Sequence, residues 1–181
     1  MNDAAPANPP VKSFVPLHVA VVTVSDTRTE ETDKSGAVLL DYVRNSGHIV
    51  ANRTIIKDDL YKLRALIANL IADETIQAGL VTGGTGFTFR DNTLAAVTPL
   101  FDMHIDGFGE LFRHLSWQEI GSSTIQSRAF AGLSNGTIVY CMPGSPGACR
   151  TAWEGIIAEQ LDARHKPCNF VEKLKTVERT G

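Results

Sequence analysis

A glycine-rich segment, LVTGGTGFTFRDNT at residues 80–93, is the part of the chain whose composition most directly indicates chemistry. Gly83, Gly84 and Gly86 leave the backbone bare around Thr85. Bare backbone lets amide N–H groups approach an anion closely, and a following helix N-terminus adds a favourable dipole. A tight turn with positive φ angles would also use glycines. The segment lacks the endings of a Walker A loop and of a dinucleotide-binding loop, so it predicts an anion site of another kind.

Two opposite charges, Arg90 and Asp91, follow these glycines directly. The planar guanidinium of Arg90 suits a phosphate. Asp91 cannot bind phosphate itself at neutral pH, and a carboxylate beside a phosphate site is typical of a bridging Mg²⁺. Asp91 could instead cap the helix expected to start near Asn92. Asp58 has the same two interpretations, a metal ligand or a helix cap.

Two further polar segments follow predicted strands. Ser25 and Asp26 end the first apolar run, where they could bind polar groups of a ligand or cap a loop. A second turn contains Pro143, Gly144 and Ser145. It could form a pocket wall with Ser145 as a donor, or it could be an ordinary strand-to-helix turn.

Alternating strands and helices are expected to position these loops. Strands are predicted at 17–25, 48–56, 78–83 and 137–142, and helices at 36–46, 60–71, 92–101, 107–131 (one or two) and 146–163. Three of the strands are continuous apolar runs, which is typical of a parallel sheet covered by helices on both faces. In such α/β sheets a ligand binds outside the carboxyl ends of the strands. We therefore expect the three polar segments to share one edge of the sheet.

The composition of the chain limits the classes of function. The net charge of -3 gives no electrostatic basis for binding nucleic acid. No apolar stretch is long enough to span a membrane, and no signal peptide is recognisable. The three cysteines have no zinc-site spacing, and with no signal peptide they favour reduced thiols and a cytoplasmic location. We expect a flexible tail at 1–14, one domain at 15–170 and a C-terminal tail at 171–181.

Several segments together resemble a known family. They are TVSDTR, DKSG, GLVTGGTGFTFRD, GFGELFR, IGSSTIQSRAFAG and MPGSPGACRTAWEGII, in this order along the chain. They are similar to the molybdenum cofactor biosynthesis family that includes MoaB, MogA and the gephyrin G domain. The resemblance covers about residues 15 to 170, and the C-terminal part is similar to the MoaB branch.

This resemblance implies a three-layer αβα sandwich that binds molybdopterin, a pterin dithiolene with a phosphate group. It implies that Mg²⁺ and ATP are used to adenylylate that phosphate with release of pyrophosphate. The family's two functional acidic positions match Asp58 and Asp91, which would hold the metal with Arg90 nearby. Its ligand-binding segments match Gly83 to Gly86 and Pro143 to Ser145. The resemblance also implies a homohexamer or trimer and contact with other enzymes of the pathway.

Two other interpretations of the sequence stay open. The chain could be a non-catalytic molybdopterin-binding or scaffold protein of the same pathway. It could also be a generic nucleotide-binding module, which would bind ATP tightly without any pterin. An assay for adenylylated pterin and pyrophosphate would distinguish the non-catalytic protein from an adenylyltransferase. A titration with ATP alone would test the generic nucleotide-binding module.

Overall fold

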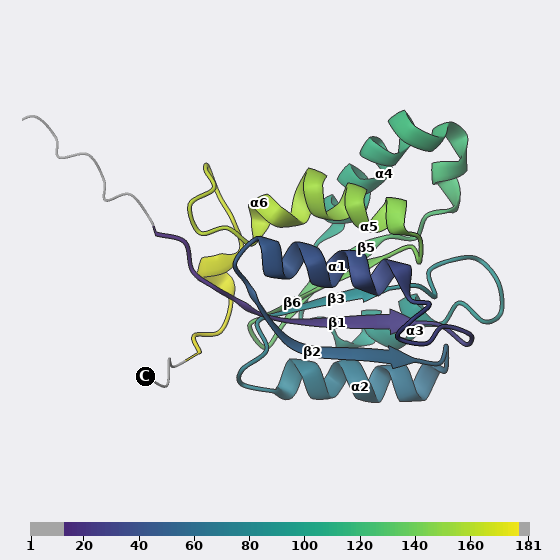
Figure 1. Ribbon diagram of the computed structural model, residues 1–181, viewed down its shortest axis with the longest axis horizontal. Helices are drawn as coiled ribbons and strands as arrows, with labels where there is room; N and C mark the ends of the chain where they lie inside the picture. Colours follow the sequence, from purple (N-terminus) through teal and green to yellow (C-terminus); the bar gives the residue numbers. More distant parts are fainter. Residues whose placement is uncertain (1–12, 178–181) are drawn as a thin grey trace, which may run out of the picture.

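A six-stranded sheet with the order β2-β1-β3-β6-β5-β4 forms the centre of the protein in the computed structural model, which describes residues 13–177 (Figure 1). The strands are β1 (His18–Val24), β2 (Ile49–Ile56), β3 (Ala78–Thr82), β4 (Met103–His104), β5 (Phe130–Ser134) and β6 (Thr137–Met142). Strands β2, β1, β3 and β6 are parallel, and β5 and β4 continue the sheet in antiparallel pairing. The predicted α/β class with a mostly parallel sheet is confirmed.

Helices cover both faces of this sheet. They are α1 (Lys34–Asn45), α2 (Leu60–Ala72), α3 (Thr93–Val97), η1 (Thr98–Leu100), α4 (Asp106–Ile120), η2 (Gly121–Gln126), α5 (Pro146–Ala152), η3 (Trp153–Ile157), α6 (Ala158–Gln160) and η4 (Val171–Lys173). Helices α1, α4, α5 and α6 lie on one face, and α2 and α3 lie on the other (Figure 1). The three-layer αβα sandwich is therefore present as expected.

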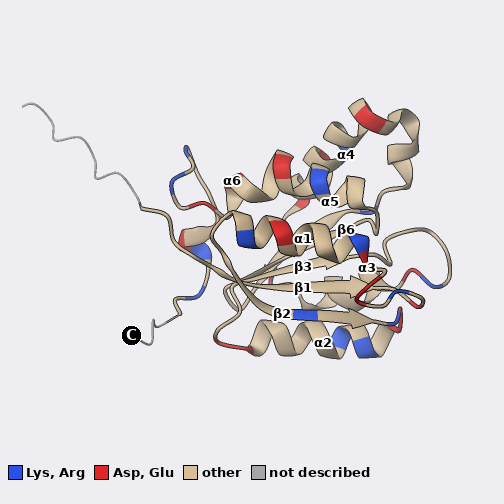
Figure 2. Ribbon diagram, in the orientation of Figure 1, with Lys and Arg blue, Asp and Glu red and all other residues tan. Residues whose placement is uncertain are grey.

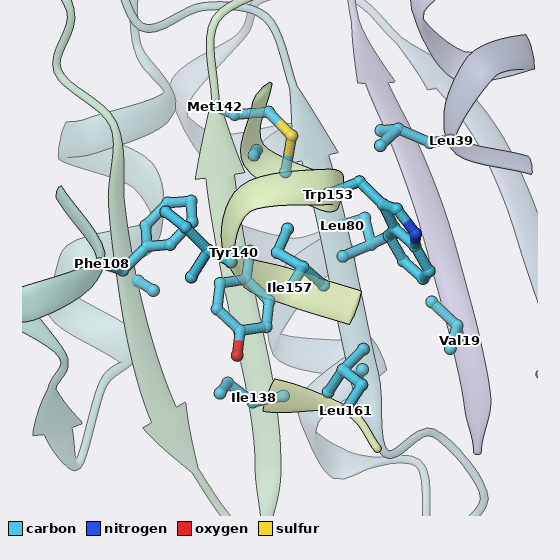
Figure 3. Packing of buried hydrophobic residues seen from close by; sticks show 14 of the residues in the cluster. Val19, Leu39, Leu80, Phe108, Ile138, Tyr140, Met142, Trp153, Ile157 and Leu161 are labelled. Carbon is cyan, nitrogen blue, oxygen red and sulfur yellow. The ribbon is translucent and has the colours of Figure 1, made fainter. Parts of the chain in front are cut away.

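The apolar runs of the strands explain why both faces are covered. In β1, Val19 and Val21 pack into one core while Ala20 and Val22 pack into the other. Successive side chains of a strand point to opposite faces, so a continuous apolar run must be buried on both. Figure 3 shows the larger core, where Trp153 and Ile157 of η3, together with Leu161, pack over the strands of the sheet.

The predicted helix over 107–131 is wrong at its C-terminal end. Helical structure ends at Gln126, and Phe130–Ser134 forms β5, which pairs with β6. Asn135 and Gly136 join these strands with φ angles of 46° and 68°. Two successive residues with positive φ form the turn that favours a two-residue hairpin, and Asn-Gly is its commonest sequence. This pair was the signal that would have predicted the strand.

Two helix ends follow the predicted capping pattern, and the structure decides between Asp58 and Asp59 as the N-cap of α2. Gly47 has a φ of 83° directly after α1, as expected for a glycine that ends a helix. The N-cap of α2 is Asp59, whose carboxylate accepts hydrogen bonds from the amides of Tyr61 and Lys62. Asp58 is therefore free of that task. Its side chain turns to a different partner, described below.

The two ends of the chain differ in what the structure describes. Residues 1–12 of the predicted N-terminal tail and residues 178–181 at the other end lie outside the described range. Within the described part of the C-terminal segment, η4 is followed by Leu174, which is buried in the larger core. The side-chain amide of Gln77 donates to the carbonyl oxygen of Lys175 at 2.8 Å.

Candidate functional site

The loops that follow β1, β3 and β6 meet at one edge of the sheet. A Cβ atom added to Gly83 would lie 2.3 Å from the carbonyl oxygen of Val24, and one added to Gly144 would lie 3.2 Å from the Cα of Gly83. The amide of Ser25 donates to the carbonyl oxygen of Ile56 at 2.8 Å, which joins the end of β2 to this edge. Figure 2 shows acidic and basic residues gathered in the loops beyond the arrowheads of β1 and β2. The expected common edge of the sheet is present.

Two of the loop glycines require the conformations that only glycine adopts readily. Gly83 and Gly84 have φ angles of 103° and 63°. A Cβ on Gly84 would lie 2.3 Å from the hydroxyl oxygen of Thr93, so a side chain has no room there. Thr93 in turn fixes the turn, because its hydroxyl donates to the carbonyl of Gly83 at 2.8 Å and its amide donates to that of Gly84 at 3.0 Å.

Asp91 closes the glycine loop and does not cap a helix. Its carboxylate accepts hydrogen bonds from the amide of Gly86 at 3.0 Å and from the amide and hydroxyl of Thr88 at 2.8 Å and 2.5 Å. Burial alone would raise the pKa of Asp91, but the hydrogen bonds from Thr88 and Gly86, with the charge of Arg128, hold that pKa below its usual value. Asp91 is therefore an ionised carboxylate that is held inside the glycine loop.

Asp58 faces the same loop from the end of β2. Its carboxylate accepts a hydrogen bond from the amide of Asn92 at 3.0 Å, and the side-chain amide of Asn92 donates to the carbonyl oxygen of Asp58 at 3.1 Å. Partial burial raises the pKa of Asp58 against the effect of the Asn92 hydrogen bonds, and the charges of Asp91 and Asp26 raise it further. Asp26 and Asp91 therefore lie near enough to Asp58 for their negative charges to act on it.

Arg90 and Asp26 form an ion pair at the same place. The guanidinium of Arg90 lies 2.6 Å from the carboxylate of Asp26, whose other oxygen accepts a hydrogen bond from the amide of Asp58 at 3.2 Å. Arg90 is 77% exposed along its side chain, so this pair is in contact with solvent and adds little stability. The guanidinium can exchange its partner for a phosphate without breaking a buried contact.

The acidic residues fit a magnesium ion that is shared with a phosphate ligand. No cluster of three or more metal-binding side chains occurs within residues 13–177. Magnesium sites of the phosphate-bridging type need only one or two carboxylates, because substrate oxygens and water supply the rest. Asp58 and Asp91 are hard oxygen ligands, and the raised pKa of Asp58 is the effect that a nearby cation would reverse. These residues could hold the ion only together with a bound phosphate.

Two of the remaining predicted residues, Ser25 and Gly144, line a small cavity at this edge, whereas Pro143 and Ser145 are not among its lining residues. The cavity has a volume of about 120 Å³ and is lined by Thr23, Val24, Ser25, Arg28, Asp33, Lys34, Ser35, Thr82, Gly144 and Pro146. The hydroxyl of Ser145 accepts a hydrogen bond from the amide of Ala148 at 3.1 Å and so caps α5. The proline-glycine turn is thus both a helix start, as the simpler interpretation held, and a wall of the cavity.

Sequence reasoning missed several residues of this region. Asp33 is buried and caps α1, accepting from the amide of Gly36 at 2.8 Å and from the hydroxyl of Thr23 at 2.8 Å. An aspartate just before a helix is a recognised N-cap signal that could have found it. Arg128 also reaches the glycine loop, as described in the last part of the Results. It lies 37 positions from Asp91, and no local pattern predicts such a contact.

A larger hollow lies at the opposite end of the strands and contains none of the predicted site residues. Its volume is about 520 Å³, and it is lined by Val15, Pro16, His18, Ile49, Gln77, Val171, Leu174, Lys175, Thr176 and Val177. It has no carboxylate and no glycine loop. Ligands of open α/β sheets bind at the carboxyl ends of the strands. We therefore place the candidate site at the carboxyl edge, despite the smaller cavity there.

Known proteins are similar to this chain in sequence and in fold over most of its length. Residues 20–163 match the family described as "Probable molybdopterin binding domain". Molybdenum cofactor biosynthesis protein B of Escherichia coli (strain K12) is 52% identical over 162 residues, which cover 90% of this chain and 95% of that protein. The protein of the same name from Bacillus subtilis (strain 168) is 46% identical over 142 residues, with 78% and 84% covered. A crystal structure of a molybdenum cofactor biosynthesis protein B superposes with a TM-score of 0.80 at 43% identity and covers 83% of this chain and 94% of its own.

Proposed function

The chain belongs to the molybdopterin-binding domain family, and from this premise we propose that it acts in molybdenum cofactor biosynthesis by adenylylating the phosphate of molybdopterin. The reaction would use ATP: an oxygen of the pterin phosphate attacks the α-phosphorus, and the bond to the departing pyrophosphate breaks. Such a transfer needs positioning and charge neutralisation more than a covalent protein group. The glycine loop and the charged residues at the carboxyl edge of the sheet can supply both positioning and charge neutralisation.

One observation carries this proposal. Asp58 and Asp91 belong to different loops, yet both accept hydrogen bonds from backbone amides of the same segment, residues 86–92. The bare backbone of the glycine loop lies between them and the cavity-lining turn at Gly144. Carboxylates beside a glycine loop are an arrangement that suits a metal-bridged phosphate.

Each side chain then has a task that its position allows. The amides of Gly84 and Thr85 would hold phosphate oxygens, because those of Gly83 and Gly86 donate to the carbonyl oxygen of Met142 and to Asp91. Arg90 would leave Asp26 to steady charge that develops on the transferred group. Asp58 and Asp91 would hold Mg²⁺, which when bound neutralises part of the triphosphate charge. Ser25 and the turn at Pro143 to Ser145 would orient the second substrate from the cavity side.

The direct test is an assay of the purified protein with molybdopterin, Mg²⁺ and α-labelled ATP. We expect labelled adenylyl-pterin and an equal amount of pyrophosphate. If molybdopterin binds tightly and neither product forms, the adenylyltransferase is refuted and the binding or scaffold role holds. Tight binding of ATP in the absence of pterin would instead favour the generic nucleotide module.

A non-catalytic role in the same pathway is the second candidate, and one observation favours it. Arg90 is paired with Asp26, and both oxygens of Asp91 accept hydrogen bonds from its own loop. A protein that only stores or presents molybdopterin could keep these contacts when its ligand binds. An enzyme must break the Arg90 contact in each cycle, so Asp26→Asn should change turnover and leave pterin affinity nearly unchanged.

We also propose a homohexamer or trimer. The exposed large apolar side chains of α4 and η2 support it, and they are Leu111, Trp117, Ile120 and Ile125. Large exposed apolar side chains on neighbouring segments commonly mark an interface. Sedimentation should give a mass that is a multiple of three chains, and Trp117→Glu should lower it.

The cellular setting of this function is part of the same proposal. No helix between residues 13 and 177 has the length and apolar character needed to cross a membrane. The three cysteines are free thiols, and Cys141 and Cys149 are buried. We propose a cytoplasmic location, where thiols stay reduced, and a place among other enzymes of the cofactor pathway. Localisation of a tagged chain tests the first statement.

A further inference from the structure

Arg128 reaches from the segment before β5 into the glycine loop that follows β3. Its guanidinium donates to the carbonyl oxygen of Thr85 at 3.1 Å, to that of Gly86, and to that of Asp91 at 3.2 Å. The same guanidinium lies over the ring of Phe87, 4.9 Å from its centroid. A planar fork with five donors can serve several carbonyls at once, which a lysine cannot do.

Two of these carbonyls belong to peptide groups whose opposite ends hold the acidic residues. In a trans peptide the N–H points away from the C=O of the same plane. The peptide that carries the Thr85 carbonyl also carries the amide of Gly86, which donates to Asp91 at 3.0 Å. The peptide that carries the Asp91 carbonyl also carries the amide of Asn92, which donates to Asp58 at 3.0 Å.

Arg128 is therefore joined to both carboxylates through two peptide planes. A cation on the carbonyl side polarises the peptide and strengthens the hydrogen bond on the amide side. It also prevents the plane from rotating, because rotation would break both bonds. Arg128 is half-buried, and its guanidinium stacks on the exposed ring of Phe87, which adds a favourable cation–π contact to these hydrogen bonds.

We propose that Arg128 is a positioning residue that sets the orientation of Asp58 and Asp91 by fixing the Thr85–Gly86 and Asp91–Asn92 peptide groups. It does not touch the reacting atoms. This inference rests on the proposed function for its effect on turnover, but its effect on the loop is independent of any reaction. The two consequences are measured separately.

The first measurement is amide hydrogen exchange in the substrate-free protein. Arg128→Met keeps an unbranched side chain, shorter than that of arginine, and removes its donors, and Arg128→Lys keeps the charge without the planar fork. Exchange at the amides of Gly86 and Asn92 should accelerate about tenfold in Arg128→Met, the factor for loss of one ordinary hydrogen bond. The amide of Ala148, bound to Ser145 on the neighbouring turn, is the internal reference and should not change.

The matched control is Arg113→Met. The guanidinium of Arg113 donates to the carbonyl oxygen of Ala129 at 3.2 Å, close to β5 but outside the glycine loop. The control should leave exchange at Gly86 and Asn92 unchanged. In the adenylylation assay, Arg128→Met should lower kcat about 10²-fold, as expected for misplaced groups, with a much smaller effect on KM for molybdopterin. Arg128→Lys should fall between Arg128→Met and the wild type, and Arg113→Met should resemble the wild type.

The outcomes separate this proposal from the proposed function. If exchange at Gly86 and Asn92 stays within twofold of the wild type in Arg128→Met, the proposal is overturned. It is also overturned if Ala148 accelerates equally, because Arg128 then supports the fold in general. If the exchange effect appears and the wild type makes no adenylyl-pterin, the adenylyltransferase fails and the role of Arg128 in the loop stands. Should Arg128→Met not fold, the same exchange comparison in Arg128→Lys decides.

Discussion

Asp91 offers the sharpest test of the site, because its structural and chemical tasks can be separated with a neighbouring control. Asp91→Ala removes three hydrogen bonds, two from backbone amides and one from the hydroxyl of Thr88. Asp59→Ala removes two, from the amides of Tyr61 and Lys62 at the start of α2. Both carboxylates lie at the carboxyl edge of the sheet, and only Asp91 belongs to the glycine loop.

The expected losses of stability are similar. Removing an N-cap such as Asp59 costs about 1 kcal/mol. The groups bonded to Asp91 are partly exposed, so water replaces some of the lost contacts, and about 1–2 kcal/mol is expected. For a domain of this size each kcal/mol lowers Tm by about 2–4 °C. Thermal unfolding should therefore show a decrease of the same order in both variants.

Turnover should separate the two variants. We expect Asp91→Ala to reduce the adenylylation rate about 10²–10³-fold, the usual effect of losing one electrostatic group from such a site. Asp59→Ala should retain the wild-type rate within about twofold, because its carboxylate contacts only α2. The measurement is pyrophosphate release at saturating ATP and molybdopterin, at a temperature where both variants are folded.

A third variant completes the comparison. Asp91→Asn keeps an oxygen that can accept from one loop amide, so it should lose less stability than Asp91→Ala. Asp91→Asn also lacks the negative charge, so its turnover should be as low as that of Asp91→Ala. If all three variants slow the reaction by the same small factor, Asp91 only shapes the loop and the metal-ligand argument is refuted.

Three further predictions concern stability. Burial and neighbouring carboxylates raise the pKa of Asp58, so its ionisation opposes folding; the penalty is absent below the unfolded-state pKa and complete above the raised one. Asp58→Asn should therefore raise Tm at pH 7 more than at pH 3 in parallel thermal scans, and equal shifts at both pH values would contradict this. Gly84→Ala should lower the free energy of unfolding by about 1–3 kcal/mol in urea titrations, because φ is 63° and the added Cβ would clash with Thr93. Gly147→Ala is its control, since nothing lies within 4 Å of the added atom in α5, and it should be neutral or stabilising. Tyr140→Phe should stabilise by about 1 kcal/mol in the same titrations, because the buried Tyr140 hydroxyl has no hydrogen-bond partner in the described residues; a loss of stability would reveal a hidden partner.

The sequence by itself determined the layers of the fold and the edge of the sheet at which the three polar loops meet. The apolar runs at β1, β3 and β6 require burial on both faces, and the stripe of α2 follows the helical period. Parallel strands place their carboxyl ends together, so the glycine loop had to meet the other two polar loops. These conclusions depend on the periodicity of apolar residues and on the order of strands and helices, and both can be seen in a single sequence.

The tertiary structure alone decided which contacts each charged residue makes. Asp58 and Asp59 are adjacent and chemically identical, and only packing shows that Asp59 caps α2 while Asp58 faces Asn92. Phe130 and Ala131, the first two residues of β5, fell inside the predicted helix, and they are strand because pairing with β6 outweighs local propensity.

Arg128 shows the same limit over a longer distance. Its contacts join residues 37 to 43 positions apart, and they form only when the sheet brings the start of β5 beside the loop after β3. A hydrogen bond depends on distances and angles that the final packing sets. Sequence spacing therefore predicted where the charges gather, and the folded chain decided which of them act on one another.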